Sequence, residues 1–214
     1  MKIENSKAKL LLHVCCACCA TEVYNRLKDN YEVTLFWYNP NIYPYSEYKS
    51  RFNSFVQLVS DLECNFLICH SEAKPKNHTV RSFSRSQHRL QDDKKNEIDR
   101  YGIENQKWQT AISGLESEPE GGRRCEQCYK YRLEKTAKAA KENGFDIFTT
   151  TLTISPHKNA TTINQIGNKI SKEYKINYLE SDFKKQDGFK KSIELSHKHN
   201  LYRQNYCGCK YSIR

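Results

Sequence analysis

The 214-residue sequence contains no long apolar run and no export signal of the usual kind. A membrane-spanning helix needs roughly 20 mostly apolar residues in a row, and no stretch of the chain approaches that length. The chain starts with MKIENSKAKLLLHVCC, whose short apolar run lacks the longer apolar core and the small-residue cleavage site of a signal peptide. These absences argue against a membrane protein and a secreted disulfide framework, so we expect a protein of the reducing cytoplasm.

Acidic residues are fewer than basic ones. The chain has 35 Lys and Arg against 25 Asp and Glu, a net charge of +10, and 12% of its residues are aromatic. The aromatic content argues against a disordered chain. The basic excess favours a polyanionic partner such as nucleic acid, although a basic surface kept for solubility would give the same balance.

Cysteine, in contrast, is abundant and clustered. Eight of the ten cysteines lie in three short motifs, whereas scattered structural cysteines do not group in this way. Thiolates group when they bind a soft metal, or when two of them exchange electrons as a dithiol and a disulfide. The motifs are CCACC (Cys15, Cys16, Cys18, Cys19), CEQC (Cys125, Cys128) and CGC (Cys207, Cys209).

Hydrophobic patterns predict strands that alternate with helices along the chain. Such alternation predicts an α/β fold, with a mostly parallel sheet of about five strands and helices on both faces, in a Rossmann-like arrangement of the HUP type. We expect residues 1–214 to form a single domain of this kind. The expected strands are 9–14, 32–38, 65–69, 146–152 and 176–179, and the expected helices are 21–28, 45–64, 124–143, 159–174 and 186–199.

Residues 71–100 interrupt this alternation. The segment has eight Lys or Arg against five Asp or Glu and few large apolar residues, so we expect a basic surface insertion that is partly helical at its end. Arg81, Arg85 and Arg89 stand at helical i, i+4, i+8 spacing and suggest an arm that contacts RNA. A solvated surface loop is the alternative.

The CCACC motif lies where the first expected strand ends and the next helix begins. Ligands of open parallel sheets bind outside the carboxyl ends of the strands, and the amino end of a helix stabilises thiolates. Two cysteines of this motif and the CEQC pair supply four thiolates, a set that fits either structural zinc or a [4Fe–4S] cluster. The motif contains no glycine, so it does not predict the phosphate loop of an ATP-using enzyme.

The CGC motif has a different chemistry. Two cysteines this close form a disulfide only with local distortion, which Gly208 permits, and a strained disulfide is easily reduced. The motif therefore suggests a redox-active pair, with a terminal metal-binding pair as the alternative. The two remaining cysteines, Cys64 and Cys69, are expected to be inert buried thiols.

Other polar residues are expected at the same edge of the sheet. His13 directly precedes the first motif and is either a site residue or a core histidine. Residues 149–151 lie at the end of the fourth expected strand, residues 155–158 follow it, and both groups should line this edge. The loop after the second strand either stacks a nucleic-acid base or packs as an ordinary turn; its aromatic and polar residues are Tyr38, Asn39, Asn41, Tyr43 and Tyr45.

Six blocks of sequence, spread along almost the whole chain from Leu10 to Cys209, resemble those of the cobalamin-independent epoxyqueuosine reductase family, the QueH type. The family usually has proline where this chain has Cys18, and its connection at 71–100 is usually shorter. The blocks are LLLHVCCACC, YNPNIYPYSEYKSR, GLESEPEGGRRCEQCYKYRLEKTAKAA, FTTTLTISPHKN, DFKKQDGFKKSIELS and YRQNYCGC.

The resemblance implies that the chain reduces epoxyqueuosine to queuosine at the wobble position of tRNA. Its partners would be the tRNA anticodon stem-loop and an unidentified electron donor. The resemblance also implies a redox-active disulfide between Cys207 and Cys209, and a second metal, a mononuclear iron, with Cys19 as a ligand. A [4Fe–4S] cluster would be held by Cys15, Cys16, Cys125 and Cys128.

Removal of an epoxide oxygen needs electrons and an acid at the oxygen, which an iron with an open position or a protonated side chain can supply. His13, Tyr43 and His157 are the candidate general acids. Two other classes stay open. A zinc-stabilised tRNA-binding module would be colourless and inactive, and an ATP-dependent tRNA thiolation enzyme would insert sulfur.

Overall fold

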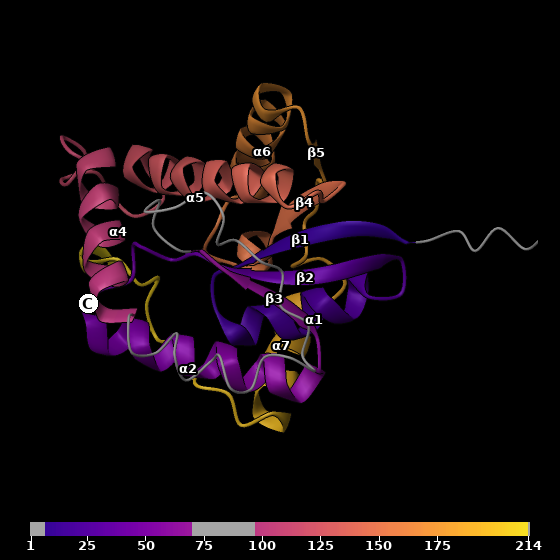
Figure 1. The fold of residues 1–214 in the computed structure, drawn as a ribbon. Coiled ribbons are helices and arrows are strands. Elements are labelled where there is room, and N and C mark those ends of the chain that lie inside the picture. The colour runs from indigo at the N-terminus through magenta and orange to yellow at the C-terminus, as the bar shows by residue number, and fades with distance from the viewer. Residues whose placement is uncertain (1–6, 70–96, 214) are drawn as a thin grey trace, which may run out of the picture.

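The computed structural model describes residues 7–69 and 97–213, which contain a five-stranded sheet. All four strand pairs are parallel, and the strand order is β3-β2-β1-β4-β5 (Figure 1). This confirms the expected α/β fold, and the order is consistent with a Rossmann-like sheet. The strands are β1 (Ala8–Val14), β2 (Tyr31–Trp37), β3 (Asn65–Ile68), β4 (Ile147–Thr150) and β5 (Asn177–Tyr178).

Helices cover both faces of the sheet. Side chains alternate along each strand, so the apolar strands present apolar side chains on both faces, and these must be buried. Leu10, Leu12 and Val14 of β1 pack with α1 (Ala17–Leu27) and α2 (Tyr45–Leu62), whereas Leu11 packs on the opposite face. The opposite face is covered by α5 (Arg123–Glu142) and α6 (Ala160–Tyr174). Helix α7 (Gly188–Lys198) lies against α1, and α4 (Glu97–Ala111) stands at one end of the sheet (Figure 1). No helix in the described ranges is both long and apolar enough to span a membrane.

The order of the strands creates a crevice beside β1. The chain leaves β1 toward β2, but β4 pairs on the other side of β1, so the loops after β1 and β4 diverge. Ligands of open α/β sheets bind at such a switch point, outside the carboxyl ends of the strands. The CCACC motif follows β1, and Thr151 begins a short 3₁₀ helix (Thr151–Ile154) directly after β4.

Several elements begin or end differently from the prediction. Helix α1 starts at Ala17 rather than at residue 21, which places Cys18 and Cys19 in its first turn. Strand β4 ends at Thr150 because the Thr150 hydroxyl accepts a hydrogen bond from the Leu152 amide and turns the chain. Helix α7 starts only at Gly188, because the two preceding residues have φ values of 57° and 59°. A left-handed backbone cannot continue into a right-handed helix.

The end of the interrupting segment is helical as expected, since α4 begins at Glu97. The helix continues to Ala111, well beyond the segment. Arg81, Arg85 and Arg89 lie outside the described residues. A second 3₁₀ turn (Lys210–Ser212), also not predicted, follows the CGC motif.

Candidate active site

Three cysteines of the first motif converge at the amino end of α1. The sulfur atoms of Cys15, Cys16 and Cys19 all lie within 4.8 Å of one another, and those of Cys15 and Cys16 are 3.9 Å apart. Cys16 is the N-cap residue, with extended backbone, and Cys19 follows three residues later on the same side of the helix. This geometry could hold a soft metal.

Cys18 lies apart from this group. Its thiol donates a hydrogen bond to the carbonyl oxygen of Tyr202 at 3.2 Å, and burial raises its pKa. It occupies the second position of α1, where the backbone N–H has no partner inside the helix. Proline is tolerated in this first turn for the same reason, so the helix is compatible with the proline that the family resemblance implies at this position.

The Cys15 thiol is the acidic member of the group. Hydrogen bonds from the Cys16 and Cys19 thiols hold the pKa of Cys15 well below its usual range, and the nearby Lys158 and Thr151 act in the same direction. The Thr151 hydroxyl lies 3.2 Å from the Cys15 sulfur and 3.1 Å from the Cys15 amide nitrogen. The pKa values of Cys16 and Cys19 are raised, chiefly through their hydrogen bonds with Cys15. Cys15 is therefore the thiolate to which the other two donate.

A cavity of about 440 Å³ opens beside these thiols. Burial alone would lower the pKa of Lys158, but the charges of Cys207 and Cys15 raise it overall, so this side chain is a cation at neutral pH. The lining residues include Cys15, Cys19, Arg51, Arg132, Lys158 and Cys207. The cavity thus combines thiols from two of the three motifs with basic side chains.

The CEQC motif lies at the start of α5, as predicted. Gly122 is the N-cap of that helix, and the amide of Gly121 donates to the Cys125 sulfur at 3.2 Å. Burial raises the pKa of both thiols, to about 11 for Cys128. Within the described residues, neither sulfur lies with Cys15, Cys16 and Cys19 in a group closer than 4.8 Å. The four-cysteine ligand set therefore stays a prediction.

The CGC motif is held by a buried arginine of α2. The Arg51 guanidinium donates to the carbonyl oxygens of Cys207 and Tyr206, both at 3.1 Å, and its Nε lies 2.7 Å from Glu47. Gly208 has a φ of 122°, and an added Cβ would stand 2.9 Å from Arg51, so only glycine fits. The motif is therefore fixed in place by its glycine and by contacts from α2.

The two cysteines of this motif have different surroundings. Cys207 lines the cavity, whereas Cys209 is buried in a small apolar cluster with Trp108, Ile112 and Cys128. Both are free thiols in this structure, as are the other eight cysteines. A redox-active disulfide between them stays a prediction.

The three candidate general acids have separate positions. His13 is fully buried, with its ring nitrogens 2.9 Å from the Thr150 hydroxyl and 3.1 Å from the Tyr38 carbonyl oxygen. Burial and the charge of Arg132 lower its pKa to about 4, so it is neutral at neutral pH. These contacts favour the core-histidine alternative. His157 lines the cavity, and Tyr43 is 44% exposed.

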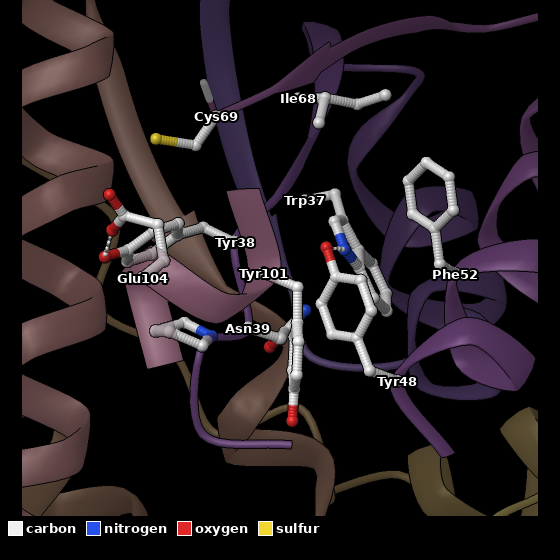
Figure 2. Close-up of a pocket in the computed structure, with 10 residues that line it drawn as sticks. Trp37, Tyr38, Asn39, Tyr48, Phe52, Ile68, Cys69, Tyr101 and Glu104 are labelled. Atoms are coloured by element: carbon white, nitrogen blue, oxygen red, sulfur yellow. Dashed lines mark hydrogen bonds between the residues drawn. The ribbon is translucent and has the colours of Figure 1, made fainter. Parts of the chain in front are cut away.

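The aromatic loop after β2 mostly packs as an ordinary turn. Figure 2 shows Trp37, Tyr48 and Tyr101 gathered around a second pocket, whose volume of about 30 Å³ has room for little more than water. The Tyr38 hydroxyl donates to Glu104 at 2.7 Å, and the Trp37 indole donates to Tyr48 at 3.0 Å. Tyr43 alone among the loop's tyrosines has a largely exposed side chain.

Arg132 and Arg51 are site residues that the sequence reasoning did not identify. Arg132 is 2% exposed and lines the cavity. A signal for it does exist: Cys125, Cys128 and Arg132 stand at i, i+3 and i+7 on α5, which places them on one face of the helix. No comparable signal links Arg51 to the CGC motif, because 156 residues separate it from Cys207.

In metal-free protein, alkylation should identify Cys15 as the reactive thiol. The thiolate is the nucleophile, so the alkylation rate of an ordinary cysteine falls about tenfold per pH unit below its pKa of about 8.5. Because the pKa of Cys15 is lowered, its rate should stay nearly constant as the pH falls from 8.5 toward neutrality. Burial raises the pKa of Cys64 to about 12, so Cys64 should not react. Iodoacetamide labelling with peptide mass spectrometry measures both rates; equal pH profiles would contradict this assignment.

Comparison with known proteins gives a consistent result. The sequence model described as epoxyqueuosine reductase QueH matches residues 10–97 and 72–214. The chain is 40% identical over 211 residues to the epoxyqueuosine reductase QueH of Streptococcus pyogenes serotype M1, covering 99% of this chain and 72% of the relative. Proteins of the same name from Staphylococcus epidermidis and Thermotoga maritima are 35% and 31% identical, over 98% and 95% of this chain and 78% and 90% of the relatives.

Proposed function

Because the chain belongs to the epoxyqueuosine reductase QueH family, we propose that its thiol-lined cavity is where epoxyqueuosine in tRNA is reduced to queuosine. The protein is an oxidoreductase of queuosine biosynthesis, and a tRNA substrate follows from that pathway. One observation supports the cavity as the site of reduction. The Cys15, Cys16 and Cys19 sulfurs meet at the β1–β4 crevice, beside the cavity that Cys207 also lines.

The donor set fits a soft metal centre. Thiolates are the preferred ligands of iron–sulfur clusters, and the lowered pKa of Cys15 provides one thiolate without a metal. We propose that a mononuclear iron beside the cluster takes Cys19 as a ligand. The cluster would be held by Cys15, Cys16, Cys125 and Cys128, and when bound it would pass electrons one at a time from the dithiol to the substrate.

The chain's own residues supply the remaining chemistry. Conversion of the epoxide to a carbon–carbon double bond releases the oxygen as water and consumes two electrons and two protons. Oxidation of the Cys207 and Cys209 dithiol to a disulfide releases the same two electrons and two protons, so the pair balances one turnover. Lys158 is a cation that lines the cavity and would hold a proton where the epoxide is proposed to bind. An unidentified electron donor then restores the dithiol.

The anticodon stem-loop would reach the cavity across a basic and aromatic rim. Phe189 of α7 lines the cavity, and the next two residues, Lys190 and Lys191, are exposed. Tyr43 and Tyr202 are 44% and 41% exposed, and the Tyr43 amide donates to the carbonyl of Gly208 at 2.7 Å. Exposed lysines pair with phosphates, and tyrosines stack on unpaired bases. Because the proposed substrate is tRNA, we propose that the protein acts in the cytoplasm.

A reconstitution experiment tests the proposed function against its alternatives. Protein purified without oxygen should be brown, contain iron, and convert epoxyqueuosine in tRNA to queuosine when dithionite is supplied. Nucleoside mass spectrometry should show the loss of one oxygen atom, and chelation of the iron should abolish the conversion. Colourless, zinc-loaded protein that binds tRNA without converting it would support the zinc module instead. Insertion of sulfur with ATP would support the thiolation enzyme.

A further inference from the structure

Arg132 of α5 is a buried cation without a carboxylate partner. Its side chain is 2% exposed, and no ion pair joins it to any acidic residue in the described part of the chain. Its Nε donates to the carbonyl oxygen of Cys128 at 3.3 Å, and its Nη1 lies 3.5 Å from the side-chain oxygen of Asn39. Its Nη2 is buried and has no hydrogen-bond partner.

Such an arrangement is costly unless an anion completes it. A guanidinium stays protonated in proteins, and a buried charge without a partner is strongly destabilising. Arg132 lines the same cavity as Cys15 and Cys207, and its Nε bonds to the backbone of Cys128. His13, which also lies nearby, has both ring nitrogens engaged in hydrogen bonds and provides no negative charge. Glu120 also lines the cavity, but it is an exposed residue, and no ion pair joins it to Arg132 within the described residues. The anions that remain for Arg132 in this cavity are the thiolates.

We propose that Arg132 is the positioning cation of the metal–thiolate centre: its free Nη2 donates a hydrogen bond to a thiolate sulfur, and its charge favours the reduced form of the centre. This inference rests on the proposed function, because it requires the centre to bind at these cysteines. Arg132 touches neither the substrate nor the reacting atoms in this role. It acts through the sulfur ligands.

Electrostatics gives the direction of the effect. Reduction adds one negative charge to the centre, so a fixed cation nearby stabilises the reduced form more than the oxidised form. Hydrogen bonds to the sulfurs act in the same direction and are a general means of setting the potential of an iron–sulfur centre. Burial strengthens both effects, because little water screens the charge. Removal of Arg132 should therefore lower the reduction potential.

The test compares Arg132→Gln with Lys130→Gln, both prepared without oxygen. Each change removes one positive charge from α5, but the Lys130 side chain is 47% exposed and pairs with Glu134. Iron content is measured first, and the reduction potential is then measured by a spectroscopic redox titration. Arg132→Gln should keep the iron of the wild-type protein but have a lower potential, whereas Lys130→Gln should match the wild type in both. An unchanged potential in Arg132→Gln overturns the inference.

Two further outcomes are informative. If wild-type protein binds no iron, the proposed function fails, and the inference fails with it. If Arg132→Gln does not fold, Arg132→Lys decides the matter, because lysine keeps the charge but not the second N–H group of the guanidinium. That variant should have a lower potential than the wild type and altered metal–sulfur vibrations in its resonance Raman spectrum. If the reduction potential and the Raman spectrum of Arg132→Lys both match those of the wild type, Arg132 does not donate a hydrogen bond to a ligand sulfur, and the inference is overturned.

Discussion

Replacing Cys15 with alanine is expected to remove the bound iron and to abolish epoxyqueuosine reduction. Cys15 is the acidic thiol of the group, and the other two members, Cys16 and Cys19, donate hydrogen bonds to it. Without Cys15 the group loses both its thiolate and the centre around which the other thiols gather. Iron analysis and visible absorption measure the first effect, and the tRNA assay measures the second, which should exceed 100-fold because a metal centre cannot form without its ligand.

Cys18→Ala is the matched control for this experiment. Cys18 lies in the same motif, but it is buried where Cys15 is partly exposed, and its thiol bonds to the Tyr202 carbonyl, apart from the other three. Iron content and activity should remain near the wild-type values. If Cys18→Ala lost its iron while Cys15→Ala kept it, Cys18 rather than Cys15 would be the metal ligand.

Cys125→Ala tests the part of the ligand set that the structure leaves as a prediction. If Cys125 is a cluster ligand, its removal should lower the iron content as strongly as the loss of Cys15. Full iron content in this variant would remove Cys125 from the ligand set. It would leave the Cys15, Cys16 and Cys19 group as a site for a single metal, since thiolates bound at 2.3 Å around one tetrahedral ion have sulfurs roughly 3.8 Å apart.

The sheet could be predicted from the sequence because its signals are local. The apolar run of β1 is buried on both faces, as only a central parallel strand can be, and the alternation of strands and helices gave the parallel topology. The location of the first motif at the carboxyl end of β1 followed from the same pattern. The sequence therefore predicted which edge of the sheet carries the site.

Contacts between distant segments could not be predicted in this way. The Arg51 guanidinium bonds to Cys207, 156 positions away, and the Thr151 hydroxyl bonds to Cys15, 136 positions away. No local sequence pattern predicts either hydrogen bond. The spacing of the CCACC motif does not by itself distinguish its four cysteines, and only the family resemblance set Cys18 apart from Cys15, Cys16 and Cys19. The structure makes the same division, because α1 begins at Ala17 and helical geometry turns Cys18 away from Cys16 and Cys19.

Replacing Cys207 with serine is expected to stop repeated turnover while the iron is retained. Serine is close to cysteine in size and can form no disulfide, so the step that releases two electrons and two protons is lost. Cys207 lines the cavity but does not belong to the group of Cys15, Cys16 and Cys19, so this change should alter the cavity lining and leave that group intact. Iron content and visible absorption should match the wild type, and conversion of epoxyqueuosine should fall by at least about 100-fold, in line with the loss of an essential chemical step.

Cys209→Ser and Cys64→Ser complete the comparison. If Cys207 and Cys209 act as a pair, Cys209→Ser should show the same loss as Cys207→Ser, although Cys209 is buried against Trp108 and Cys128. Cys64 is a buried thiol outside the cavity lining, so Cys64→Ser should convert epoxyqueuosine as the wild type does. Normal turnover in Cys209→Ser would end the proposal of a redox pair and leave Cys207 to act alone. Loss of iron in Cys207→Ser would instead make Cys207 a metal ligand, which its place on the cavity wall beside Cys15 and Cys19 would also allow.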